Sequence, residues 1–231
     1  NRYVMIKKML TIAGAMALNA ITYGQPDELG AWYNYFGNQQ LQKSNWNLHT
    51  EIQYRNFNKG GDLEQLLLRT GIGYNLTPGN NNILLGYGFI HGRPYVKQGL
   101  DEKYTVNEHR LFQQFTTKQS IARVNVQHRY RFEQRFLPDN FKLRFRYLLG
   151  VTIPVNKPAM EANAIYLSGY NELFIHTSGA IFDRNRSFAG VGYVIKKDLR
   201  FDVGFMRQML AQNSRNQLMV SLYNNLPVSF N

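Results

Sequence analysis

Strict alternation of apolar and polar side chains over long stretches is the feature that most constrains this chain. In residues 122–136 one face is mostly apolar, while the other reads Arg123, Asn125, Gln127, Arg129, Arg131, Glu133, Arg135. Residues 46–55 and 141–153 repeat the pattern. Successive strand residues point to opposite faces, so a period of two indicates β-strands. We find no sequence pattern for an amphipathic helix of ordinary length and predict an all-β fold.

Turns rich in Pro, Gly, Asn and Asp divide the chain into eleven expected strands. These cover 30–38, 46–55, 63–76, 82–92, 107–117, 122–136, 141–153, 164–175, 187–195, 199–208 and 216–224. Bacterial single-chain barrels close with an even number of strands. We therefore expect ten to twelve strands, with twelve as the best guess. Alternatively, residues 30–38 are not part of the wall and do something else, such as entering the lumen.

Residues 1–24 have the pattern of upstream residues and a cleavable signal peptide. Lys7 and Lys8 precede an apolar run at 9–18, and small and polar residues follow up to Gly24. The run is too short to span about 30 Å of hydrocarbon as an anchor. We predict an exported protein whose residues 25–231 form a single domain, since no shift in composition marks a second one.

Strand length and aromatic placement decide which face of the sheet is wet. Several strands reach the roughly 9–11 residues that a tilted strand needs to cross a bilayer, whereas strands of soluble domains cluster near 5–6 residues. Rings that suit the headgroup zone lie near strand ends at Trp32, Trp46, Tyr54, Tyr74, Phe89, Phe136, Tyr193 and Tyr223. We predict an antiparallel up-and-down transmembrane β-barrel in contact with outer-membrane lipid and lipopolysaccharide. The alternative is a soluble exported ligand-binding β-barrel, which buries its apolar face.

Composition and motifs exclude several other classes of function. The chain has no Cys, which excludes a disulfide scaffold and a thiol nucleophile. Its net charge of +12 would suit nucleic acid, but export and the spread of charge along strand faces argue against that partner. We find no metal-binding or cofactor motif and expect neither group.

The polar strand faces carry the candidate site, a charge network inside the barrel. Its predicted members are Glu51, Arg55, Arg69, Glu108, Arg110, Arg129, Arg131, Glu133, Arg135, Arg144, Arg146 and Glu172. One interpretation is a lumen packed by arginine–carboxylate pairs. The other is a narrow pore for small anionic solutes, since arginine rings select anions and eight of these twelve residues are basic.

An outer-membrane hydrolase acting on lipid or ester substrates is a third hypothesis. It depends on His49, which shares the polar face with Glu51, and on Ser168 near Glu172. The same residues fit lumen packing, and none of the five histidines lies in a nucleophile motif. His128 is predicted on the lipid face. The inward glycines (Gly71, Gly73, Gly86, Gly88, Gly190, Gly192 and Gly204) are predicted to make room for large lumen side chains.

Several motifs in order along the chain resemble a known family. They are Trp46-x-Leu-His-Thr-Glu-x-Gln-Tyr-Arg55, Gln65-x-Leu-Leu-Arg-Thr-Gly-Ile-Gly-Tyr74, Glu108-His-Arg110, Arg129-x-Arg-x-Glu-x-Arg135, Arg144-x-Arg-Tyr147, Tyr170-Asn-Glu172, and Phe182-Asp-Arg-Asn-Arg186 before Gly190-Val-Gly-Tyr193. The chain resembles the "domain of unknown function 2490" family of exported Gram-negative outer-membrane β-barrel proteins. At position 184 it has Arg where that family commonly has Gln. The resemblance implies a fold and a location, and it implies no activity.

Overall fold

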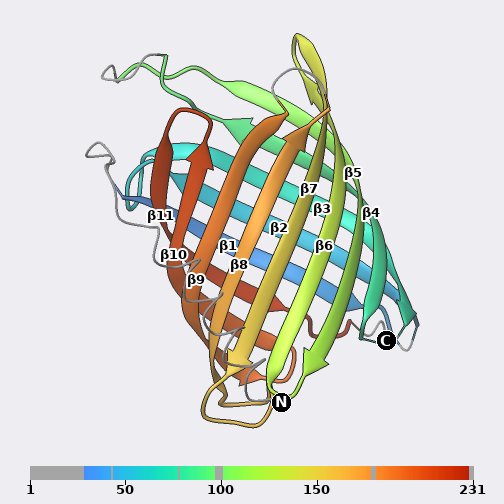
Figure 1. Cartoon of the computed structure of the whole chain (residues 1–231). Coiled ribbons are helices and arrows are strands. Elements are labelled where there is room, and N and C mark those ends of the chain that lie inside the picture. Colours follow the sequence, from blue (N-terminus) through green and yellow to red (C-terminus); the bar gives the residue numbers. More distant parts are fainter. Residues whose placement is uncertain (1–28, 43, 78, 97–100, 178–180, 229–231) are drawn as a thin grey trace.

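The described part of the chain is a single closed β-barrel (Figure 1). The structure is a computed structural model that describes residues 29–42, 44–77, 79–96, 101–177 and 181–228, so the predicted signal peptide lies outside the described residues. The strands are β1 (Gly30–Gln40), β2 (Trp46–Asn56), β3 (Leu63–Thr77), β4 (Asn81–Gly92), β5 (Val106–Ile121), β6 (Val124–Leu137), β7 (Asn140–Pro154), β8 (Ile165–His176), β9 (Phe182–Lys196), β10 (Leu199–Leu210) and β11 (Ser214–Asn224). The all-β prediction is confirmed. Within these ranges, no helix has the length and apolar character needed to cross a membrane.

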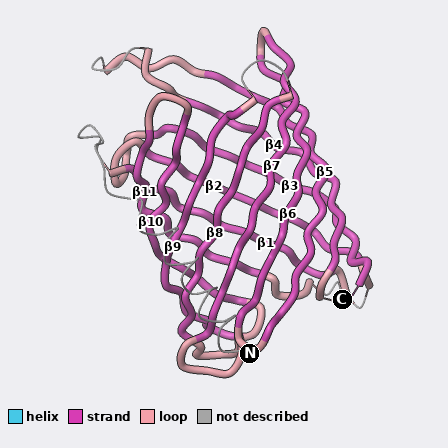
Figure 2. The backbone as a smooth tube through the Cα atoms, in the orientation of Figure 1, coloured by secondary structure: helices cyan, strands magenta, loops and turns pink. Residues whose placement is uncertain are grey.

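The barrel closes through one parallel pair of strands. β1 lies beside β11 in parallel register, from Gly30↔Gln217 to Gly37↔Asn224, and every other neighbouring pair is antiparallel (Figure 2). The eleven strands lie within the predicted range of ten to twelve, but the best guess of twelve is wrong, and 30–38 belongs to the wall rather than the lumen. An odd number can close because a parallel ladder also pairs the edge N–H and C=O groups.

Two strands exceed the predicted length by at least five residues, and β6 begins two residues later than predicted. β5 continues to Ile121 and β9 begins at Phe182 instead of 187. The start of β6 moves from Ala122 to Val124, because Ala122 adopts a φ of 54° in the two-residue turn between β5 and β6. The turn needs that left-handed conformation, which apolar patterning does not encode.

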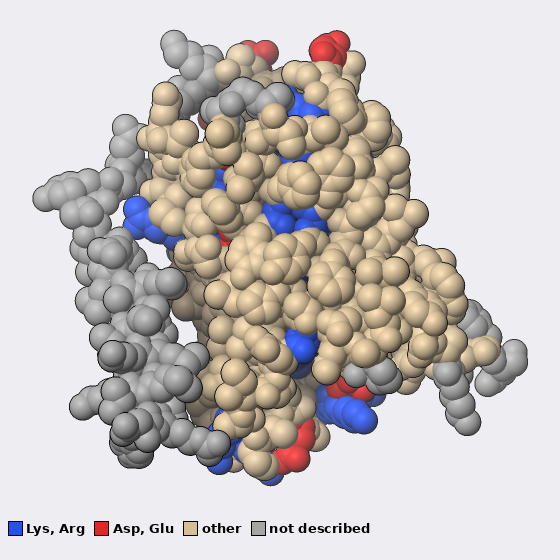
Figure 3. Space-filling view, turned by 45° about the vertical axis from the view of Figure 1, so that its right-hand side comes forward, with Lys and Arg blue, Asp and Glu red and all other residues tan. Residues whose placement is uncertain are grey.

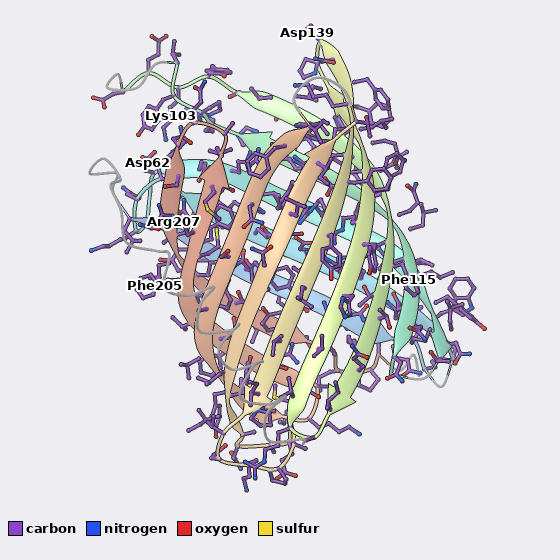
Figure 4. All side chains as sticks on the ribbon, in the orientation of Figure 1. Asp62, Lys103, Phe115, Asp139, Phe205 and Arg207 are labelled. Carbon is purple, nitrogen blue, oxygen red and sulfur yellow. The ribbon has the colours of Figure 1, made fainter. Side chains whose placement is uncertain are left out.

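The two ends of the barrel carry different connections. We call the end at Asp139, at the top of Figure 4, the upper mouth, and the other end the lower mouth. The upper mouth holds the connections 57–62, 93–105, 138–139, 177–181 and 211–213. The lower mouth holds 41–45, 78–80, 122–123, 155–164 and 197–198. Each mouth therefore has one connection longer than the rest, at 93–105 and at 155–164.

The outer wall is apolar and exposed in mid-strand. Phe205 is 62% exposed and Leu85 61% exposed, and Phe205 and Phe115 extend away from the wall in Figure 4. Side chains other than Lys, Arg, Asp and Glu cover most of the wall seen in Figure 3, where the acidic side chains lie mostly near the ends. Burial of Arg131 (2% exposed) beside exposed Tyr130 confirms the predicted direction of the alternation.

Part of the lumen is filled by apolar side chains. Trp32, Phe188, Met206 and Met219 form a buried cluster with Tyr170 packed against it. We call these five residues the apolar lumen cluster. They come from β1 and from β8 to β11, so this cluster occupies one side of the barrel.

Two aromatic placements differ from the prediction. Trp32 is 2% exposed and Tyr223 stacks on Phe36 inside the barrel, with ring centroids 5.2 Å apart. The rings of Trp32 and Tyr223 therefore face the lumen rather than the headgroup zone.

The glycine prediction is confirmed at Gly204. A Cβ at Gly204 would lie 2.8 Å from Phe188 and also 2.2 Å from a backbone oxygen, so only glycine fits there.

Candidate functional site

All twelve residues of the predicted charge network project into the lumen. Ten of them are at most 7% exposed, and Arg129 and Arg135 are half-buried. They reach the lumen because alternate residues of β2, β3 and β5–β8 point inward in the register that the antiparallel ladders fix. The structure thus brings together side chains from six strands.

Glu108 on β5 joins two arginines at the upper mouth. Arg110 donates to both carboxylate oxygens, with N···O distances of 2.6 and 2.8 Å. Arg135 of β6 does the same at 2.6 and 3.0 Å. Two bidentate guanidinium groups therefore share one carboxylate, and the trio carries one positive charge in excess.

Glu133 and Glu172 join three arginines in the middle of the network. Glu133 is fully buried, and it accepts hydrogen bonds from Arg144 at 2.9 Å and from Arg146 at 2.7 Å. Arg146 also donates to Glu172 at 2.6 Å, and Arg129 donates to the same oxygen at 2.7 Å. These contacts connect β6, β7 and β8 through side chains as well as through the backbone.

Glu51 of β2 extends the network across the lumen. It accepts a hydrogen bond from Arg69 of β3, and its other oxygen lies 3.8 Å from a nitrogen of Arg131 on β6. Arg131 in turn donates to Gln114 at 2.7 and 2.8 Å. β2 and β6 are not neighbours in the wall, so this ion pair spans the interior.

Three lumen residues lie in a segment that the strand prediction left out. Asp183, Arg184 and Arg186 fall before the expected strand start at 187. Asp183 accepts from Arg144 at 2.9 Å and from Arg184 at 3.1 Å. The register between β8 and β9 shifts between Phe174 and Ile175, so strict alternation breaks here. The polar string Asp-Arg-Asn-Arg was the available signal.

Arg55 and Arg186 differ from the other arginines of the upper lumen because neither forms an ion pair with a carboxylate that the structure describes. Arg55 Cζ lies 3.8 Å from the ring centroid of Trp32, and Arg186 Cζ lies 4.8 Å from it. Arg55 donates to Gln65 at 3.0 Å and Arg186 to Gln208 at 2.9 Å. Neither guanidinium has a carboxylate oxygen within 4.0 Å among the described residues. Both side chains are nevertheless buried, at 5% and 6% exposed.

A hollow in the upper lumen is lined almost entirely by guanidinium groups. Its volume is about 340 Å³, which includes space open to solvent. We call it the arginine cavity; its lining residues are Arg55, Gln65, Arg69, Arg110, Arg135, Arg144, Arg146, Phe174, Arg184 and Arg186. Its neighbour, the vestibule, has a volume of about 780 Å³, which also includes space open to solvent. Its lining residues are Phe57, Glu64, Gln65, Ile90, Gly92, Pro94, Val106, Glu108, Arg135 and Leu137. The two hollows share Gln65 and Arg135.

Comparison with known proteins identifies the chain. A family model described as "Protein of unknown function (DUF2490)" matches residues 29–219. The chain belongs to the DUF2490 family. The match begins just before β1 and ends within β11, so nearly the whole barrel wall is covered. No curated protein and no solved structure matches the chain.

The residues of the hydrolase hypothesis have other partners in this DUF2490 barrel. His49 Nε2 lies 3.5 Å from Glu51, but that carboxylate is held by Arg69. Ser168 donates to Asp202 at 3.2 Å instead of approaching Glu172. His128, on the outer wall as predicted, is 2.9 Å from the Tyr147 hydroxyl. Among the described residues, no group of three or more His, Asp or Glu side chains could hold a metal ion.

Proposed function

We propose that this DUF2490 chain is an integral outer-membrane β-barrel whose lumen is closed by its arginine–carboxylate network. The carrying observation is the direction of the side chains: exposed apolar residues cover the wall and charged residues fill the interior. A barrel is suited to hydrocarbon because closure pairs the backbone groups of every strand. The apolar wall favours a protein that lies in lipid, and the filled interior favours one that does not conduct ions at rest.

The exposed apolar area supports the membrane part of this proposal. Soluble monomers rarely expose contiguous apolar patches larger than a few hundred Å². Here the exposed large apolar side chains recur on strand after strand, for example Leu85 on β4, Phe145 on β7 and Phe205 on β10. Acyl chains would cover such a wall at no cost in lost hydrogen bonds.

Contacts across the interior support the closed lumen. The Glu51–Arg131 pair joins β2 to β6 across the lumen, and Tyr166 of β8 lies over Gly192 of β9 and donates to the Phe201 carbonyl of β10 at 3.1 Å. The Trp32 ring contacts both Arg55 and Arg186 inside the barrel. Side chains that bridge opposite walls leave hollows rather than a continuous channel.

A matched pair of substitutions on the outer wall tests the location. Phe205→Arg places a guanidinium in mid-strand, while Ile121→Arg places one at the last residue of β5; the native residues are 62% and 61% exposed. In a bilayer the first substitution costs about 2–4 kcal/mol and the second about 0–1 kcal/mol. We expect heat-modifiable protein in outer-membrane fractions to be lost with Phe205→Arg only. Equal folding of both variants, as an aqueous protein, would favour the soluble ligand-binding barrel.

A narrow anion-preferring pore is the second candidate, favoured by the number of lumen arginines without a carboxylate of their own. Planar bilayer recording separates the two candidates. The closed lumen predicts no steady current from the wild-type protein. A steady current with an anion-biased reversal potential would replace the closed lumen with the pore.

A further inference from the structure

In the described upper lumen the arginines outnumber the carboxylates by five, and the Glu64–Arg215 pair near the rim leaves that surplus unchanged. The arginines are Arg55, Arg69, Arg110, Arg129, Arg131, Arg135, Arg144, Arg146, Arg184 and Arg186. The carboxylates are Glu51, Glu108, Glu133, Glu172 and Asp183. A buried charge without a counter-charge is costly. An arrangement with ten cations and five anions is therefore electrically incomplete without an anion from outside the chain.

The surplus has a definite location at the arginine cavity. Arg55 and Arg186 both line it, and both lack a carboxylate partner within the described residues. The Nε of Arg69, which also lines the cavity, is buried without a hydrogen-bond partner. Trp32 holds the first two guanidinium groups by cation–π contact, which fixes their position without neutralising them. Donors on β2, β3 and β9 thus converge on one space.

We infer that the arginine cavity binds a phosphate group. Guanidinium groups offer paired donors that match the oxygens of phosphate, and a dianion neutralises two of the surplus cations at once. The donors approach the cavity from three strands of the barrel wall. This arrangement suits a tetrahedral oxyanion better than a planar carboxylate. Chloride would supply one charge and no such geometry.

The vestibule indicates how a phosphate group reaches the cavity. It lies at the upper mouth and shares Gln65 and Arg135 with the arginine cavity. Phe57, Ile90 and Leu137 give part of its lining an apolar character. The phosphate can therefore be free in solution, or it can be the head of a molecule whose apolar part occupies the vestibule.

Calorimetric titration of the folded full chain in detergent micelles with inorganic phosphate tests the inference at constant ionic strength. We expect saturable binding by the wild-type protein. The double substitution Arg55→Gln with Arg186→Gln removes two charged donors and leaves no carboxylate stranded. Each charged hydrogen-bonding group contributes about tenfold in affinity, so we expect about a hundredfold weaker binding.

Arg200→Gln is the matched control. Arg200 also faces the lumen, 4.6 Å from the Tyr223 ring, but it lies near the lower end of β10 and outside the arginine cavity. Its substitution removes one positive charge, as Arg55→Gln and Arg186→Gln each do alone, and should alter phosphate affinity less than about twofold. An equal loss in Arg200→Gln and in either single variant would overturn the site, since only net charge would then matter.

The absence of saturable phosphate binding by wild-type protein would overturn the inference without any variant. If the double variant does not fold, each single substitution still predicts about a tenfold loss. Titration with hexyl phosphate distinguishes the two sources. If the natural ligand is a phosphate with an apolar part, hexyl phosphate should bind more tightly than inorganic phosphate, because burial of its chain in the vestibule contributes about 0.8 kcal/mol per CH₂. A free phosphate predicts equal affinities. These titrations need no membrane, so their failure is distinguishable from failure of the proposed location.

Discussion

The two sides of the lumen are filled in different ways. The apolar lumen cluster fills its side with rings and thioethers that lie over glycines, as Phe188 does over Gly204. The side formed by β5–β8 is filled by guanidinium and carboxylate groups around Glu133. Only the ionic side depends on a balance of charge. Substitutions on the apolar side should therefore lower stability by leaving a cavity. Substitutions on the ionic side should lower it by leaving a buried charge unpaired.

Glu133→Gln should give the largest effect, because it removes the carboxylate that Arg144 and Arg146 share. Removing one partner of a buried ion pair costs about 3–5 kcal/mol. Urea unfolding of the protein in lipid vesicles measures the loss. The control is Glu64→Gln, since Glu64 lies 3.4 Å from Arg215 and both side chains are partly exposed. Equal losses for the two variants would remove the distinction between lumen and rim.

Met206→Ala should give the next largest effect, on the apolar side. Met206 is fully buried in the apolar lumen cluster, and truncation of such a side chain costs about 2–5 kcal/mol through lost transfer and a residual cavity. Met209→Ala, on the outward face of the same strand, is the control and should change the free energy of unfolding by about 0.5 kcal/mol or less. A small effect at Met206 would mean that the cluster does not support the wall.

Arg55→Gln tests an arginine that has no carboxylate partner among the described residues, in contrast to the shared carboxylate of Glu133. The substitution loses a cation–π contact with Trp32, of about 0.5–2 kcal/mol, and it relieves repulsion from the other lumen arginines. We expect a net change in unfolding free energy within about 1 kcal/mol of zero. The measurement is the same urea titration, in phosphate-free buffer. A loss as large as that of Glu133→Gln would show that Arg55 has a carboxylate partner after all.

Lys103→Gln should have the smallest effect, since it lies at the rim of the upper mouth. Lys103 pairs with Asp62 and donates to the Leu63 carbonyl at 3.1 Å. Partly exposed pairs of this kind contribute about 0–1 kcal/mol. We expect faster proteolysis within 93–105 and unchanged unfolding of the barrel. A global loss of stability would extend the ionic network to the rim.

Much of the wall was predictable from sequence because the alternation is strict where it matters. The register of 122–136 placed Arg131 and Glu133 inside, since a slip of one residue would move every side chain to the other face. The same rule placed Glu51 and Arg69 inside. Their pairing followed from the ladder between β2 and β3, where Glu51 faces Arg69.

Three features could not be predicted, each for a physical reason. Trp32 lies in a segment with rings on both faces, so a period of two cannot choose its side. Asp183 and Arg184 follow a register shift that breaks the period. The count of eleven depends on closure between β1 and β11, which are nearly the full chain apart and leave no local signal.

The parallel pairing of β1 with β11 has a consequence for sidedness. Strands that run side by side in the same direction place the start of β1 at the upper mouth and the end of β11 at the lower mouth. The barrel therefore has polarity: in a bilayer, epitope tags joined before Gly30 and after Asn224 would be exposed to antibodies on opposite sides. An even-stranded barrel would present both tags on one side. Antibody binding to intact cells therefore distinguishes an odd from an even number of strands.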